Sequence, residues 1–189
     1  GKDTANSLRH WDKNDISPKT DDIFQERLYC IQWSSCKNPK VTFYREVTDE
    51  DARRERKVEE LVREHINEWQ TRGLVPDMPI LPGDETTRLI RERGWTHWNH
   101  LFSARHLLTL ALWREYSNNH PAEHLILANS LNFFSKLCGI HPRTPGSGRE
   151  MCLDRVFINQ ALNTLVNYGV RSFAYWPDNA SDFPSVSLP

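Results

Sequence analysis

A long amphipathic helical pattern at residues 48–71 restricts the fold of this 189-residue chain more than any other feature. Thr48 suits the N-cap position, and the acidic residues Asp49 and Glu50 follow in the first turn, where the helix dipole favours negative charge. Gly73 is a typical stop signal, so we expect one long helix with a solvated, charged face. Its apolar residues recur at spacings of three and four, at Val58, Leu61, Val62, Ile66 and Trp69.

Two leucine-rich segments predict a pair of helices at the centre of the domain. Ser103 is a suitable N-cap for a helix over residues 104–116, which is apolar most of the way round and should therefore be central. Pro121 suits the first turn of a second helix, residues 122–138. Because the connection between them is short, these helices should form an antiparallel hairpin. One more helix is expected at about residues 157–168.

Two short segments rich in aromatic and β-branched residues, at 26–33 and 41–47, predict a β-hairpin. An isolated hairpin is marginal in water, so it should either pack on helices of this chain or add to a sheet outside it. The expected fold class is therefore mainly α with one β-hairpin (α+β), with a helical-hairpin core and long proline-rich loops.

The composition divides the chain into three parts. Residues 1–22 lack apolar periodicity and are interpreted as an extended arm or linker, which docks through Trp11 or belongs to a neighbouring domain. Residues 23–175 form the mainly helical domain, and residues 176–189 form an extended tail. Two long loops with several prolines interrupt the domain, at residues 74–96 and 140–154.

Charge and hydropathy exclude several classes of protein. The chain has 24 Lys and Arg residues against 25 Asp and Glu residues, and a net charge of -1 argues against binding a polyanion over the whole surface. No run of about 18 apolar residues is present to span a membrane, and the start has no apolar signal-peptide core. We therefore expect a cytoplasmic protein. Because Gly1 takes the place of an initiator methionine, a segment of a longer protein is favoured.

The cysteine pattern does not predict a metal site. Four cysteines are far apart, and no pair has the spacing of a zinc knuckle or ribbon. Reduced, mostly buried thiols are the simplest interpretation for a cytosolic protein. The cysteines are Cys30, Cys36, Cys138 and Cys152. A zinc site built on the first two would need further ligands, for which the candidates are His65, His97, His100 and His106.

No familiar catalytic motif occurs in the sequence. It lacks a Walker-type glycine-lysine loop, a Gly-x-Ser-x-Gly elbow and a helix with paired metal-binding histidines. Isolated candidates, such as His106 beside Arg105 or Asp154 beside Arg155, are more typical of caps and surface residues than of general bases. We therefore expect no catalysis by this chain alone and assign no catalytic residue.

A cluster of basic and aromatic residues near the middle of the chain predicts a binding surface. Arginine side chains contact phosphates, while flat aromatic rings stack on exposed bases. The candidate DNA-binding residues are Arg88, Arg91, Arg93, Trp95, His97, Trp98, His100 and Arg105. The alternative is that both tryptophans belong to the core and that the arginines are neutralised by nearby glutamates, namely Glu85, Glu92 and Glu115.

Four stretches occur in an informative order: Asp21–Cys30, Gly94–Leu108, the helix from Ala122 to Leu137, and Asn159–Gly169. Each is unspecific alone, but together they span almost the whole chain. In this order they resemble the large adenine-specific DNA methylases that carry an inserted zinc ribbon, many of which are associated with anti-phage defence loci.

The resemblance implies a place within a larger enzyme. In that family, the motif that binds S-adenosylmethionine lies upstream and the Asp-Pro-Pro-Tyr motif that holds the flipped adenine lies downstream, and neither occurs here. The family's zinc-ribbon cysteines also lack counterparts. The chain would thus be a DNA-recognition or organising insert of an adenine-N6 DNA methyltransferase, in a bacterial or archaeal restriction-modification or anti-phage system. Its partners would be DNA, the other methyltransferase domains of the parent chain and other defence-system subunits.

Two other functions stay open. The first is a helical protein–protein interaction module of a multi-subunit defence complex, in which the charged helix around Glu60 and the proline-rich residues 74–83 dock another subunit. The second, less favoured, is an independent small metalloenzyme.

Overall fold

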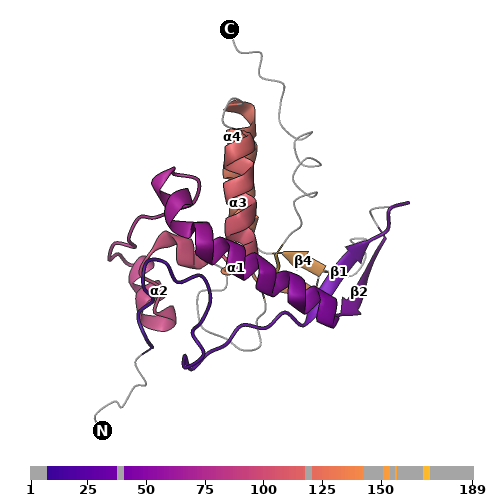
Figure 1. The fold of residues 1–189 in the computed structure, drawn as a ribbon, viewed down its shortest axis with the longest axis horizontal. Helices are drawn as coiled ribbons and strands as arrows, with labels where there is room; N and C mark the ends of the chain where they lie inside the picture. The colour runs from indigo at the N-terminus through magenta and orange to yellow at the C-terminus, as the bar shows by residue number, and fades with distance from the viewer. Residues whose placement is uncertain are drawn as a thin grey trace.

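The computed structural model describes residues 8–37, 41–117, 121–142, 151–153, 156 and 168–170. It confirms the predicted fold class, because helices dominate this part of the chain and a β-hairpin precedes them. Figure 1 shows α1 across the middle, with α3 and α4 standing upright on it. The order is β1 (Cys30–Ser34), β2 (Thr42–Glu46), α1 (Asp49–Thr71), α2 (Thr86–Arg93), η1 (Trp98–Leu101), α3 (Ala104–Tyr116), α4 (Pro121–Ser130), η2 (Leu131–Phe133), β3 (Ile140–Pro142) and β4 (Met151–Leu153).

Helix α1 begins and ends where its sequence predicts. The hydroxyl of Thr48 accepts a hydrogen bond from the backbone NH of Asp51, and the Asp51 carboxylate accepts one from the Thr48 NH at 3.1 Å. This reciprocal capping box satisfies donors that the first turn leaves unpaired. Past the last turn, Gly73 adopts a φ of 68°, a left-handed conformation that glycine accepts without strain.

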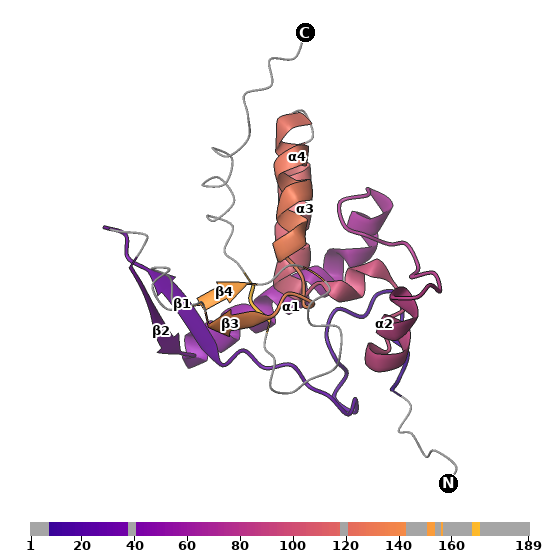
Figure 2. The same ribbon diagram turned by 180° about the vertical axis from the view of Figure 1, so that it is seen from behind.

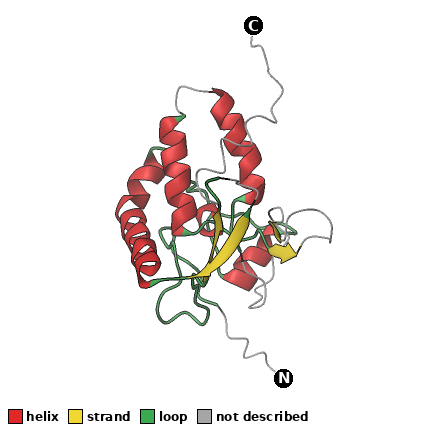
Figure 3. Ribbon diagram, turned by 90° about the vertical axis from the view of Figure 1, so that its right-hand side faces the viewer, coloured by secondary structure: helices red, strands yellow, loops and turns green. Residues whose placement is uncertain are grey.

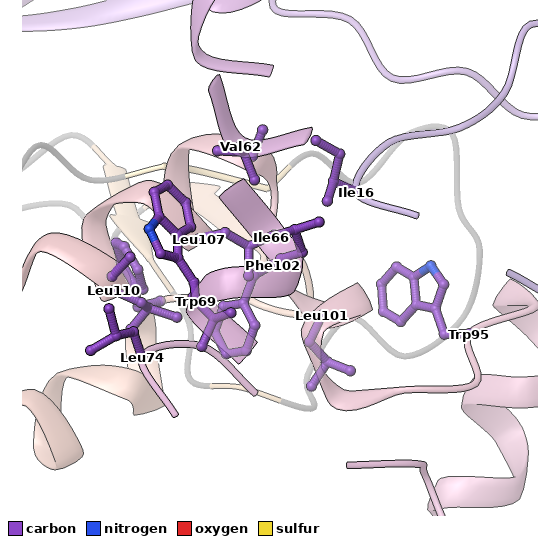
Figure 4. Close-up of a cluster of buried hydrophobic side chains, with 14 of the residues drawn as sticks. Ile16, Val62, Ile66, Trp69, Leu74, Trp95, Leu101, Phe102, Leu107 and Leu110 are labelled. Atoms are coloured by element: carbon purple, nitrogen blue, oxygen red, sulfur yellow. The ribbon is translucent and has the colours of Figure 1, made fainter. Parts of the chain in front are cut away.

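The core lies where α1, α3 and the segment between them meet. Helix α3 packs against α1, and Ser103 caps α3 as predicted. Trp113 of α3 donates its indole NH to the carbonyl of Glu123 at the start of α4 (3.3 Å), and Figure 3 shows the two helices side by side. Figure 4 shows part of this core, with the labelled residues Ile16, Val62, Ile66, Trp69, Leu74, Trp95, Leu101, Phe102, Leu107 and Leu110.

The described part of the N-terminal arm packs into this core. Trp11 and Ile16 are both buried. The Trp11 backbone NH donates to the carbonyl of Gly94 (2.8 Å), and the Thr96 hydroxyl donates to the carbonyl of Trp11 (2.6 Å). Residues 8–22 therefore dock through Trp11, one of the two alternatives that the sequence left open.

Three local predictions differ from the structure. Helix α2 lies inside the predicted loop 74–96, and β3 and β4 pair within the predicted loop 140–154. Helix α4 ends at Ser130, earlier than the predicted residue 138, where the chain tightens into the short 3-10 helix η2, and residues 134–138 then enter the core in a non-helical conformation. The predicted helix at 157–168 falls outside the described residues apart from Tyr168, and the tail 176–189 falls wholly outside them.

The β1–β2 hairpin is shorter than predicted and stands at one end of the molecule. Its strands are antiparallel, with Trp33 directly opposite Phe43 and Ile31 opposite Arg45. Among the described residues, no helix or other strand packs broadly against it, and its contact with α1 includes the ion pair between Arg45 and Asp51. Figure 2 shows the hairpin and α2 at opposite ends of the molecule. No helix within the described ranges is long and apolar enough to cross a membrane.

Candidate nucleic-acid interface

The arginines of helix α2 share a small number of carboxylates. Arg91 lies 2.7 Å from the carboxylate of Glu92, and Arg88 lies 3.5 Å from the same carboxylate and 3.7 Å from Glu85. The arginines lower the pKa of Glu92, chiefly through the hydrogen bond from Arg91, so it remains charged. Both arginine side chains are exposed, but their charge is largely balanced within the helix.

Arg93 and Trp95 lead from α2 into the core. Trp95 is buried and packs edge-on against Trp11, with ring centres 6.3 Å apart. The guanidinium of Arg93 lies 5.0 Å from the Trp95 ring centre, a cation–π contact, and burial lowers the pKa of Arg93. Trp95 is therefore a core residue rather than a ring available to a nucleobase.

His100 is a fully buried structural histidine. Its Nδ1 accepts hydrogen bonds from the backbone NH groups of Thr96 (3.1 Å) and His97 (3.2 Å). Its Nε2 lies 3.0 Å from the carbonyl of Asp12, which only accepts, so Nε2 carries the proton. Burial lowers the pKa of His100 to about 4, and the ring is neutral at pH 7.

The two neighbours of His100 in the predicted site are partly buried. Trp98 packs against the core cluster from the start of η1. His97 lies within 2.9 Å of the Thr96 hydroxyl through its Nδ1, and burial lowers its pKa. Neither residue projects freely from the surface.

Arg105 joins two helices. Its Nε lies 2.8 Å from Oε1 of Glu55, and a terminal nitrogen contacts the same oxygen, so an ion pair links α3 and α1. The structure thus gathers the eight sequence-predicted residues at α2, η1 and the start of α3. Trp95 and His100 are buried there, Arg105 is paired between helices, and Arg88 and Arg91 are the exposed cations.

A second surface lies on the β1–β2 hairpin, and sequence reasoning did not assign it to binding. Side chains directly opposite each other in an antiparallel pair share a face, so Ile31, Trp33, Phe43 and Arg45 line one side. We call this side the hairpin platform. Trp33 is 39% exposed and Phe43 is 52% exposed, values far above those of core aromatics. Exposed apolar residues that gather on one face are typical of an interaction surface.

The sequence of the hairpin and of the residues that lead into it is rich in basic residues. Between residues 27 and 46 the sequence holds four basic residues and one acidic residue, Glu46, although the whole chain has a net charge of -1. Arg27 and Lys37 are exposed, and neither forms an ion pair with another described residue. Basic residues interleaved with aromatic rings are typical of nucleic-acid-binding surfaces. Two features of the sequence point to the hairpin platform. They are the excess of basic residues between positions 27 and 46 and the alternation of aromatic with polar residues.

The described residues hold no group of three or more His, Cys, Asp or Glu side chains arranged to bind a metal ion. Cys30, Cys36 and Cys138 form no disulfide among the described residues, and Cys138 is buried. No protein-family profile matches this chain, and neither the curated proteins nor the solved structures include a significant match.

Proposed function

We propose that this chain is a DNA-recognition or organising insert of an adenine-specific (N6) DNA methyltransferase, and that the hairpin carries its main DNA contacts. One observation supports the DNA contact above all: Arg27 and Lys37, which flank the exposed rings of Tyr29 and Trp33 in the sequence, are exposed cations without an ion-pair partner among the described residues. Cations that are not already neutralised gain most from releasing the counterions of DNA.

The resemblance to adenine-specific methylases supports the rest of the proposal. Methylation of an adenine requires its extrusion from the duplex, which calls for auxiliary surfaces that hold the neighbouring strand. S-adenosylmethionine and the catalytic motif would be supplied by other parts of the parent enzyme. Such a protein acts in the bacterial or archaeal cytoplasm, as part of a modification or anti-phage system.

The test is duplex DNA binding as a function of salt. Fluorescence anisotropy of a labelled duplex between about 50 and 200 mM salt yields the slope of log affinity against log salt, which changes by about 0.9 for each phosphate that the protein no longer neutralises. We expect Arg27→Ala with Lys37→Ala to make this slope shallower by about two units. The matched control, Arg88→Ala with Arg91→Ala, removes the same charge at the opposite end of the molecule and should change the slope little.

Three results would decide whether the hairpin or helix α2 contacts the DNA. A shallower slope from the hairpin pair supports the proposal. A shallower slope from the α2 pair alone would keep the DNA-binding function but move it to the segment first identified in the sequence. Absence of binding to duplex and to single-stranded DNA at the lowest salt, by both this chain and the intact parent enzyme, would contradict the DNA-binding function altogether.

A protein–protein interaction module is the second candidate, and the proline-rich loop favours it. Met78 and Leu81 in this loop are 63% and 71% exposed. The charged face of α1 lies close by in sequence, with Arg63 paired to Glu59 at 3.5 Å. If this surface docks another subunit, charge reversal at Arg63 and Glu64 should weaken co-elution with that subunit in size-exclusion chromatography, while DNA affinity stays unchanged.

A further inference from the structure

We propose that the hairpin platform is a stacking surface for unpaired bases of a DNA strand, so that the chain prefers single-stranded over duplex DNA. This inference rests on the proposed DNA-binding function and specifies how the DNA is bound. Phosphate contacts alone recognise any DNA, whereas flat rings bind only bases that have left the stack.

The placement of the two rings suits adjacent unpaired bases. Trp33 and Phe43 are directly opposite each other on neighbouring strands, which brings their side chains together on one face. Both rings are exposed, and no other helix or strand of the described chain covers them broadly. Pairs of aromatic side chains on an open sheet are a recurrent way of holding single-stranded nucleic acid.

A chain of contacts holds one ring in place before any ligand arrives. The guanidinium carbon of Arg45 lies 4.9 Å from the Trp33 ring centre, and Arg45 also lies 3.2 Å from the carboxylate of Asp51. That carboxylate is fixed in turn by the hydroxyl of Thr48 at 2.6 Å. The N-cap of α1 therefore orients Arg45, and Arg45 orients Trp33, which lowers the entropy lost when a base stacks.

Charge favours nucleic acid over a protein as the occupant. Arg27 and Lys37, which form no ion pair with another described residue, complement a phosphate backbone, and the opposite face of the hairpin is polar. There the Gln32 side-chain amide donates to the Tyr44 hydroxyl at 3.2 Å. The hairpin therefore has one face suited to bases and a polar face suited to water, while Arg27 and Lys37 supply positive charge for the phosphates of the strand.

The experiment compares a labelled 15-nucleotide oligothymidylate with a duplex of the same length, using the full 189-residue chain at constant salt. We expect Trp33→Leu and Phe43→Leu each to weaken single-strand binding by about tenfold, which corresponds to roughly one stacked base. Duplex affinity should change less than about threefold. Trp33→Phe keeps a ring and should retain most of the affinity. Tyr44→Leu is the matched control, because it removes an aromatic ring from the opposite face.

The outcomes separate this inference from the proposed function. Equal loss of single-strand and duplex affinity in the leucine variants, or no loss in either, would overturn the stacking role while leaving DNA binding intact. Unchanged binding in Trp33→Leu together with reduced co-elution with a protein partner would assign the platform to protein docking instead. If the unmodified chain and the parent enzyme bind neither DNA form, both the inference and the proposed function are wrong.

Discussion

The ammonium group of Lys136 lies 2.9 Å from the carboxylate of Glu26, although the Lys136 side chain is almost fully buried. Its charge also lies 4.7 Å from the ring centre of Trp11 and 5.4 Å from that of Trp95. Tyr168 donates its hydroxyl hydrogen to the second carboxylate oxygen of Glu26 at 2.8 Å. One buried charge thus joins the N-terminal arm, the segment after α2 and the chain that follows α4.

Removing Lys136 should reveal how much this junction contributes to stability. We expect Lys136→Ala to lower the free energy of unfolding by about 3 kcal/mol, because it leaves a cavity and removes the ion pair. Lys136→Met should cost only about 1 kcal/mol, since it keeps the packing between the two rings and Glu26 can be solvated. Urea denaturation measures both values. Equal losses for the two variants would contradict the packing explanation.

Two glycines with the same left-handed backbone provide a matched pair for a second prediction. A Cβ at Gly94 would lie 2.1 Å from the carbonyl oxygen of Arg9, whereas a Cβ at Gly73 would meet nothing within 4 Å. Gly73→Ala should therefore cost only the backbone strain, about 1 kcal/mol. Gly94→Ala should cost about 3 kcal/mol, because the arm must also move. Similar losses at both positions would show that the arm does not dock at Gly94.

Substitution of Arg105 tests whether this residue has a structural role or a DNA-binding role. Because its ion pair with Glu55 is partly exposed, Arg105→Ala should lower the free energy of unfolding by only about 1 kcal/mol. Duplex affinity should stay within about twofold. A double-mutant cycle with Glu55→Ala checks whether the two side chains act together. Reduced DNA affinity without loss of stability would instead favour the phosphate contact expected from the sequence.

The buried histidines predict a loss of stability in mild acid. Burial lowers the pKa of His100 to about 4 and that of His106 to about 3, against 6.5 in the unfolded chain. The unfolded state therefore binds protons first, so stability is complete above about pH 6.5 and falls as the pH decreases toward 4. Each histidine contributes about 1.4 kcal/mol per pH unit across this range.

Urea denaturation at several pH values measures this slope. His106→Gln should reduce the slope, even though the variant is less stable at neutral pH. A slope that His106→Gln does not alter would assign the acid sensitivity to other groups.

The helices that the sequence predicted well are determined by residues that are close together in the chain. The caps of α1 and α3 and their apolar periodicity are local patterns, and both helices have the expected bounds. Helix α2 was missed because its eight residues include only two apolar side chains, Leu89 and Ile90, and no side chain caps its start. Short helices with few apolar residues need tertiary support.

The candidate site was less predictable for the same reason. Arg105 and Trp95 have the residue types of a DNA contact, and only the fold pairs the first with Glu55 and packs the second against Trp11. The aromatic residues of the hairpin carried a periodicity that predicted strands. Whether those rings would be buried depended on whether a helix covered them, which local sequence does not specify.

Photo-cross-linking of the chain to a single strand containing 5-iododeoxyuridine tests the central claim most directly. Cross-linked peptides identified by mass spectrometry should come from residues 27–46, with attachment at Trp33 or Phe43. The two candidate surfaces lie at opposite ends of the molecule, so the peptides discriminate between them (Figure 2). Cross-links confined to residues 86–105, or a pattern unchanged when Trp33 and Phe43 are both replaced by leucine, would contradict the assignment of the hairpin as the DNA-binding element.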